Sequence, residues 1–231
     1  MNDLTLRKIA VLHGDFPTKF GIPRQSGLAP SQRSMIVFEP EYRDANALRG
    51  LDGYTHLWLI WGFSAVPQKD AFAPMVKPPR LGGNKRMGVF ATRSPFRPNP
   101  IGLSSVRLEA IEQRQKLGTV LIVSGADLMD GTPIYDIKPY LPFTDSHPDA
   151  KGGFSEEGLE HVLHVEFPAE LLSLIPADKR EALFEALRQD PRPAYRDDPS
   201  ERYGFYYAGF DVRFTVNGKS LTVCEIVPAD F

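Results

Sequence analysis

The sequence contains a single cysteine, Cys224, among 231 residues. One thiol excludes a disulfide within the chain, and its place in the alternating run LTVCEIV predicts a buried strand residue without a reactive role. No apolar run approaches the roughly 18 residues that span a bilayer, and the start MNDLTLRKIAV lacks the basic and apolar regions of a secretion signal. We therefore expect a cytoplasmic protein.

The sequence also lacks the motifs of several common enzyme classes. Its five histidines have no cysteine or carboxylate neighbours at zinc-binding spacing, so no metal site is expected. A Walker A loop, a GxGxxG turn and a GxSxG nucleophile elbow are all missing, which argues against nucleotide-binding loops and serine hydrolase sites. Helical periodicity is nearly absent before residue 143, so the alternating strands and helices of a Rossmann fold are not expected.

The first 143 residues instead contain short segments rich in β-branched and aromatic residues, separated by Gly, Pro and Asn. This pattern predicts strands in LTLRKIAVL, SMIVFEP, THLWLIWGF, MGVFATR, SSVRLEAIE, GTVLIVSGA and PIYDIKPYL. We therefore predict a mainly β domain, a barrel or a sandwich, over residues 1–143. The Pro- and Gly-rich segment Phe143–Gly153 is a predicted linker.

A smaller α+β domain is predicted over residues 154–231. Its pattern indicates a strand in HVLHVEF, a helix from about Ala177 to Gln189, and a hairpin between FDVRFTV and SLTVCEI. Asn217 and Gly218, between the two hairpin strands, suit the positive φ angles of a type I′ turn.

Charge is distributed unevenly along the chain. Residues 144–231 carry 17 acidic and nine basic side chains. Residues 71–108 carry no Asp or Glu but seven basic side chains: Lys77, Arg80, Lys85, Arg86, Arg93, Arg97 and Arg107. A partner that bears phosphates would favour this basic stretch. The alternative is a solvated basic face that offsets an acidic one.

Two loops are candidates for a binding site. The segment GVFATRSPFRPNPIGLS presents Arg93 and Arg97 among three prolines, which stiffen the loop and reduce the entropy lost on binding. The alternative is a tight connection whose arginines are merely solvated. In ADLMDGTPIYDIKPY, Asp130 begins a turn and could accept hydrogen bonds from a ligand, whereas Asp127 could simply cap the turn.

These segments together resemble the TrmO (TsaA-like) family of tRNA adenosine-37 N6-methyltransferases. The similar stretches, in order, are FGIPRQSGL, RGLDGYTHLWLIWGF, VKPPRLGGNKRMGVFATRSPFRPNPIGLS, DLMDGTPIYDIKPYLPF and DPRPAYR. The resemblance implies a single-sheet β-barrel, unlike Rossmann-type methyltransferases, with S-adenosylmethionine bound near a homodimer interface. It also implies a substrate, N6-threonylcarbamoyladenosine at position 37 of threonine tRNA, in the anticodon stem-loop.

The same resemblance implies the residues that contact the cofactor. They are Pro23, Arg24, Gln25, Arg93, Leu103, Asp130, Gly131, Thr132 and Pro133. The family often has His-Gln after the strand WLIWGF, but this chain has Ser64 and Ala65, so a contact there would use the backbone.

The residues for RNA binding and catalysis are less defined. The basic stretch offers phosphate contacts from Lys77, Arg80, Lys85, Arg86 and Arg97. An aromatic side chain such as Phe96, Tyr195 or Tyr203 could stack on a displaced base. Asp136 and Tyr140, near Asp130 in the sequence, are candidate general bases, and Lys138 could contact a phosphate or an anion.

Two other functions are compatible with the same residues. A noncatalytic RNA-binding module would use the basic stretch and bind tRNA regardless of cofactor. A small-molecule N-methyltransferase would bind S-adenosylmethionine and have no affinity for tRNA.

Overall fold

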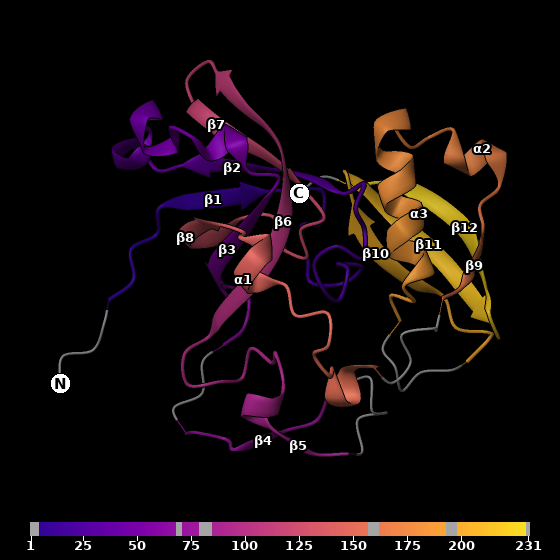
Figure 1. Ribbon diagram of the computed structural model, residues 1–231. Helices are drawn as coiled ribbons and strands as arrows, with labels where there is room; N and C mark the ends of the chain where they lie inside the picture. Colours follow the sequence, from indigo (N-terminus) through magenta and orange to yellow (C-terminus); the bar gives the residue numbers. More distant parts are fainter. Residues whose placement is uncertain (1–4, 68–70, 79–84, 157–161, 193–197, 230–231) are drawn as a thin grey trace.

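The computed structural model describes residues 5–67, 71–78, 85–156, 162–192 and 198–229. Six antiparallel strands form one closed ring in the order β1, β2, β7, β6, β3, β8 (Figure 1). Their bounds are β1 (Ala10–His13), β2 (Arg33–Phe38), β3 (His56–Gly62), β6 (Ile101–Arg114), β7 (Gly118–Ser124) and β8 (Thr132–Pro139). The prediction of a mainly β protein is confirmed.

The ring has its own hydrophobic core because its strands alternate. In β3, Leu57, Leu59 and Trp61 are buried while the residues between them are half-buried. A two-residue period places one set of side chains on the inner face of a sheet. The same core includes Leu12 and Ile36 from the neighbouring strands.

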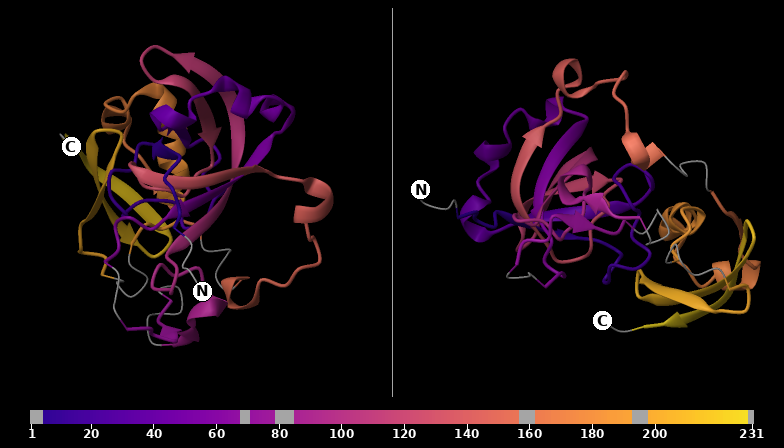
Figure 2. Two further views of the ribbon diagram at one scale, coloured as in Figure 1. Left: turned by 90° about the vertical axis from the view of Figure 1, so that its left-hand side faces the viewer. Right: turned by 90° about the horizontal axis from the view of Figure 1, so that it is seen from below.

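The C-terminal unit, residues 162–229, contains a four-stranded sheet in the order β10, β11, β12, β9. The strands are β9 (His164–Glu166), β10 (Tyr203–Tyr207), β11 (Phe210–Asn217) and β12 (Ser220–Pro228), with helices α2 (Ala169–Leu172) and α3 (Arg180–Arg188). A 3-10 turn, η7 (Ala177–Lys179), leads into α3, so the predicted helix is confirmed. This unit lies beside the ring, as Figure 2 shows from two sides.

Short elements fill the connections. They are η1 (Pro40–Tyr42), η2 (Ala45–Leu48), η3 (Leu51–Gly53), β4 (Met75–Val76), β5 (Met87–Gly88), η5 (Val89–Ala91), α1 (Pro142–Asp145) and η6 (Gly153–Glu156). Asp145 anchors the start of the connection between the ring and the C-terminal unit, because its carboxylate accepts the Trp58 indole N–H at 2.8 Å and the Leu141 N–H at 2.9 Å. The Leu141 N–H, and then the Trp58 indole, lower the pKa of Asp145.

Two predicted strands are shorter than expected. The segment MGVFATR keeps two strand residues and then turns into η5, because the Thr92 hydroxyl donates to the Val89 carbonyl at 2.8 Å and closes the turn. Among the described residues of LTLRKIAVL, the strand begins only at Ala10.

The hairpin of β11 and β12 is confirmed, but two details differ from the prediction. Asn217 pairs with Ser220, so the turn residues are Gly218 and Lys219, and only Gly218 has a positive φ (59°). This is the pattern of a type II′ turn. Cys224 is exposed, because it follows buried Val223 and therefore points to the other face of β12. The register then shifts, with Glu225 opposite Arg213 and Val223 opposite Phe214, which leaves Cys224 as an extra residue in β12.

Candidate functional site

One end of the ring gathers the loops that carry the predicted cofactor residues. The register pairs Leu12 with Thr132, Gly62 with Ile101, and Arg33 with Ser124. Strands β1, β3 and β7 therefore end, and β2, β6 and β8 begin, at the same end of the ring. Predicted contact residues from four separate stretches of the sequence lie in or next to the loops there.

Arg93 contacts the early PRQ segment directly. Its Nη1 donates to Gln25 Oε1 at 2.5 Å, although the two residues are 68 positions apart. The Gln25 amide in turn donates to the Arg24 carbonyl at 2.5 Å. Arg24 reaches into the C-terminal unit, where its guanidinium donates to the Asp190 carbonyl at 2.8 Å. Arg93 is exposed, so much of its guanidinium faces solvent.

Asp127 belongs to the same site. Its Oδ1 accepts the Ser104 hydroxyl at 2.5 Å, and Ser104 Oγ accepts the Trp61 indole N–H at 3.0 Å. Burial raises the pKa of Asp127, and the Ser104 hydroxyl and the charge of nearby Arg93 oppose that rise. Sequence reasoning treated Asp127 only as a possible turn cap, because no short motif marks a carboxylate whose partners are distant in the chain.

The DGTP turn is fixed to the end of β1. Asp130 Oδ1 accepts the Gly14 N–H at 3.1 Å and lies 3.2 Å from His13 Nδ1. Gly131 has φ of 76°, which explains a glycine at this position. Thr132 is buried, and its hydroxyl donates to the Met129 carbonyl at 2.7 Å. The turn continues the loop that contains Asp127.

The remaining predicted cofactor residues lie at the same end. Ser64 and Ala65 follow β3 and are exposed. Leu103, near the start of β6, is 52% exposed and adds an apolar surface, whereas Pro23 is buried. Pro133 is half-buried and pairs with Val11 of β1.

Next to the Arg93 loop lies a surface that we call the basic-aromatic surface. It consists of Phe72, Lys77, Lys85, Arg86 and Phe90, all of them exposed. The rings of Phe72 and Phe90 stack with centroids 6.2 Å apart and an interplanar angle of 26°. The pairing of β4 with β5, Val76 opposite Met87, brings Lys77 next to Arg86.

The other RNA candidates have varied positions. Phe96 is 46% exposed, whereas Arg97 is half-buried and donates to the Thr92 carbonyl at 3.1 Å, so it stiffens the loop. Tyr203 is only 8% exposed and stacks on Phe214 in the C-terminal core, so the prediction that it stacks on a base is wrong. Arg80 and Tyr195 lie outside the described residues.

The two candidate bases are not brought to the DGTP turn. Asp136 forms an ion pair with Lys138 at 2.9 Å, and it lies four residue steps along β8 from Thr132, roughly 13 Å at 3.3 Å per residue. Tyr140 lies at the opposite end of the ring, beside Trp58 with ring centroids 5.5 Å apart. Within the described ranges, no group of three or more His, Cys, Asp or Glu side chains could hold a metal ion.

Comparison with known proteins identifies the family. The family model described as "tRNA-methyltransferase O N-terminal domain" matches residues 11–146, and the "TrmO C-terminal domain" matches residues 160–229. The chain belongs to the TrmO family. Family membership covers both the ring and the C-terminal unit.

Individual relatives agree with this assignment. The tRNA (adenine(37)-N6)-methyltransferase of Escherichia coli K12 is 40% identical over 236 residues, covering 99% of this chain and 100% of the relative. A Pseudomonas aeruginosa protein, provisionally named the S-adenosylmethionine-dependent methyltransferase RcsF, is 39% identical over 89% of this chain and 90% of its own length. A crystal structure of TrmO from Pseudomonas aeruginosa superposes with a TM-score of 0.78, at 32% identity over 98% of this chain and 100% of that one.

Proposed function

We propose that this protein is an S-adenosylmethionine-dependent tRNA methyltransferase that methylates N6 of the adenosine at position 37. The proposed substrate is N6-threonylcarbamoyladenosine in threonine tRNA. The observation that carries the reaction is the 40% identity, over the full length of both chains, with the Escherichia coli tRNA (adenine(37)-N6)-methyltransferase. The threonylcarbamoyl group and the threonine tRNA come from the family resemblance.

The residues at the loop end of the ring fit S-adenosylmethionine. The exposed Arg93 guanidinium suits a carboxylate, and the carboxylates of Asp127 and Asp130 suit an ammonium group or ribose hydroxyls. Leu103 offers an apolar surface for a base. Ser64 and Ala65 would contribute backbone groups only. When bound, the cofactor supplies a methyl group that its sulfonium already activates.

Catalysis by this site would rest mainly on positioning. No covalent intermediate with the protein is needed, because holding the acceptor nitrogen in line and close to the methyl group removes much of the entropic barrier. A general base would help to remove the N6 proton. Asp127 fits this role better than Asp136 or Tyr140, because it lies in the loop beside Arg93 and has a raised pKa.

The basic-aromatic surface is the proposed contact for the anticodon stem-loop. Lys77, Lys85 and Arg86 would contact phosphates, and the stacked rings of Phe72 and Phe90 offer a platform for an unstacked base. Its nearness to the Arg93 loop would place the RNA beside the cofactor. We also propose that the protein acts in the cytoplasm.

Two aspects of organisation belong to the same proposal. Residues 1–143 and 154–231 would form two domains, each built around its own hydrophobic core, with Phe16 of the first packed into the core of the second. The protein would form a homodimer, with the exposed apolar side chains of Ile101 and Leu103 available for the contact. Sedimentation equilibrium would test the dimer. In the described residues, no helix is long and apolar enough to cross a membrane.

A single experiment tests the activity. The protein is incubated with cofactor carrying a labelled methyl group and with threonine tRNA, either with or without the threonylcarbamoyl modification. We expect label only in the modified tRNA, on N6 of adenosine 37. Binding of tRNA without methyl transfer would indicate a noncatalytic RNA-binding module. Cofactor binding without tRNA affinity would indicate a small-molecule methyltransferase.

The cofactor site is tested with Arg93→Ala. Removing the guanidinium should weaken cofactor binding by about tenfold or more, as expected for loss of a charged hydrogen bond of about 1.5–3 kcal/mol. Isothermal titration calorimetry measures the Kd. Arg114→Ala is the matched control, because Arg114 pairs with Glu112 in the β6–β7 hairpin, at the opposite end of the ring. Equal cofactor affinity in both variants would contradict the assignment of Arg93.

A further inference from the structure

The segment Gly14–Phe16 follows β1 but is built into the other unit. Phe16 is 1% exposed and belongs to the C-terminal hydrophobic core. Its ring lies 5.0 Å from that of Tyr207 and 6.2 Å from that of Phe205, between ring centroids. The Asp15 carbonyl accepts the Ala208 N–H at 2.8 Å. The C-terminal unit therefore holds this segment by both its side chains and its backbone.

The same segment holds the DGTP turn of the proposed cofactor site. The Phe16 carbonyl accepts the Asp130 N–H at 2.8 Å, and the Gly14 N–H donates to Asp130 Oδ1 at 3.1 Å. The Gly131 N–H donates to the Leu12 carbonyl at 2.9 Å. A movement of residues 14–16 would therefore move the turn.

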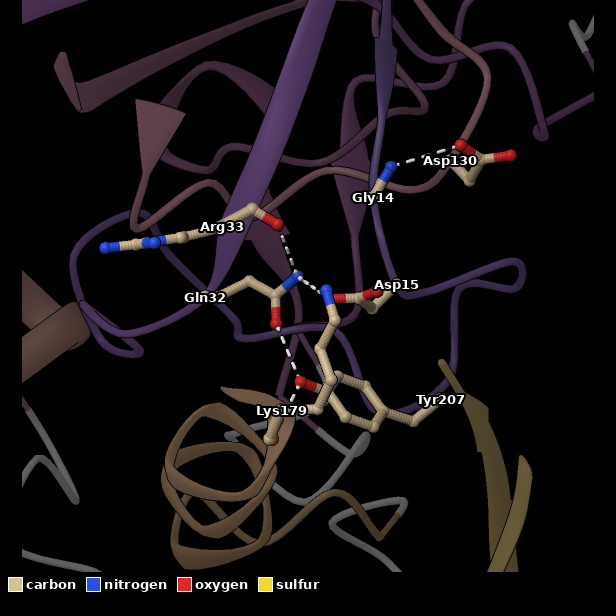
Figure 3. Close-up of polar contacts among 7 residues, drawn as sticks. All are labelled: Gly14, Asp15, Gln32, Arg33, Asp130, Lys179 and Tyr207. Atoms are coloured by element: carbon tan, nitrogen blue, oxygen red, sulfur yellow. Dashed lines mark hydrogen bonds and ion pairs between the residues drawn. The ribbon is translucent and has the colours of Figure 1, made fainter. Parts of the chain in front are cut away.

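A polar cluster fastens the segment to the C-terminal unit (Figure 3). The Asp15 carboxylate accepts Lys179 Nζ at 2.8 Å and Gln32 Nε2 at 3.2 Å. The Tyr207 hydroxyl donates to the Lys179 carbonyl at 3.1 Å. Gln32 and Tyr207 are 1% and 0% exposed, and the side chains of Asp15 and Lys179 are 15% and 29% exposed. Because both side chains are mostly buried, this ion pair is screened less than a fully exposed pair.

Together these contacts form a continuous connection from the C-terminal unit to the site. Lys179 of η7 binds Asp15, Asp15 precedes Phe16, and Phe16 binds Asp130. Figure 3 shows Lys179 and Tyr207 on one side of Asp15, and Gly14 with Asp130 on the other. The contact with Lys179 and the contact with Asp130 are made by adjacent residues, Asp15 and Phe16, and the buried ring of Phe16 limits their movement. Such a path transmits displacement because packed cores deform little.

We propose that the C-terminal unit sets the position of the DGTP turn, and that Asp15 and Lys179 are positioning residues for cofactor binding. The effect on the cofactor rests on the proposed function, whereas the effect on the turn does not. The C-terminal unit thus contributes to the cofactor site through the segment Gly14–Phe16.

The test compares Lys179→Met with the wild-type full-length protein. Methionine keeps the apolar stem but leaves the Asp15 carboxylate without its cation. We expect hydrogen exchange at the Asp130 and Gly131 amides, measured by NMR, to accelerate about tenfold as local opening becomes easier. The Kd for S-adenosylmethionine should rise about threefold to tenfold, since small displacements weaken binding in an organised site. The affinity for tRNA should stay within about twofold.

Three variants make the result specific. Lys179→Arg keeps a cation within reach of Asp15 and should restore wild-type exchange and Kd. Arg213→Met removes the cation that pairs with Asp211 and Glu225 elsewhere in the C-terminal unit, and should change neither quantity. Asp15→Asn replaces Lys179→Met if the latter does not fold, and should act in the same direction.

The outcomes separate the effect on the position of the DGTP turn from the effect on cofactor binding. Unchanged exchange at Asp130 and Gly131 in folded Lys179→Met or Asp15→Asn protein would overturn the positioning role. The same acceleration in Arg213→Met would overturn it too, because general destabilisation would then explain the effect. A wild-type protein that binds no cofactor would overturn the proposed function and the cofactor part of this inference, while the exchange data still decide whether the turn is positioned.

Discussion

Gly102 should be the least replaceable residue in the Pro-rich loop region. A Cβ added there would lie 2.2 Å from Trp61 Cε2 and 2.3 Å from Cζ2. Carbon atoms prefer separations of about 3.5–4.0 Å, so the indole would have to move by more than about 1 Å. Trp61 cannot move freely, because it is 9% exposed and packs edge-on against Phe63 with centroids 4.4 Å apart.

The cost of Gly102→Ala follows from these contacts. Overpacking a core costs about 1–3 kcal/mol, and displacing the indole would break its 3.0 Å hydrogen bond to Ser104, worth about 1 kcal/mol. We expect the free energy of unfolding to fall by about 2–4 kcal/mol, or about 2–4 °C in Tm for each kcal/mol in a chain of this size. Cofactor affinity should fall as well, because Ser104 donates to Asp127.

Denaturant unfolding followed by tryptophan fluorescence measures this cost. The matched control is Gly88→Ala, since an added Cβ at Gly88 meets nothing within 4 Å and φ there is −59°. The control should stay within about 0.5 kcal/mol of wild type. A Gly102→Ala protein as stable as the Gly88→Ala protein would refute the steric argument, because the two changes add the same methyl group.

Three further predictions concern the site. Phe90→Ala should weaken tRNA binding by about 1–3 kcal/mol through loss of a stacking surface. Phe143→Ala, at a ring that is also largely exposed (87% against 72% for Phe90) but lies in α1, should not; fluorescence anisotropy with labelled tRNA distinguishes them. Arg86→Glu should weaken tRNA binding and reduce the slope of log K against log salt by about 1 or more; an unchanged slope would exclude a phosphate contact. Asp127→Asn should slow methyl transfer and remove one contribution to the pH dependence of stability. Because the pKa of Asp127 is raised in the folded protein, its own contribution to wild-type stability is full below about pH 3.9 and is lost as pH rises through the folded-state pKa. Equal slopes of wild type and variant in pH-resolved denaturation would contradict this.

The sequence predicted the ring strands well because their alternation reports burial directly. In β3, for example, the run HLWLIWG buries Leu57, Leu59 and Trp61 on one face. Prediction from the sequence failed where a contact between distant segments decides the local structure. The run LTVCEIV predicts a buried Cys224, yet the period that buries Leu221 and Val223 turns Cys224 to solvent, and the bulge opposite Arg213 then returns Ile226 to the core. Strand β10 and its turn at Ala208 and Gly209, with φ of 50° and 83°, gave no signal of comparable strength.

The candidate site was predicted in part for the same reason. Motif resemblance named Gln25 and Arg93, and the structure brings their side chains together. The sequence does not mark Asp127 as a site residue, because its place in the site depends on hydrogen bonds through Ser104 and Trp61, which are distant from it in the chain. Asp136 and Tyr140 are close to Asp130 in the sequence alone. An extended strand carries such neighbours apart rather than together.

The placement of Phe16 has a consequence for how the molecule unfolds. A residue from the beginning of the chain completes the hydrophobic core formed by residues 163–226. Neither core can therefore melt without disturbing the other, and we expect a single cooperative transition, not the two that separate cores would suggest. A chain truncated after residue 153 would lose the core that covers Phe16 and would leave this phenylalanine exposed beside the DGTP turn. The two units therefore cannot be separated cleanly by cutting the chain in the linker.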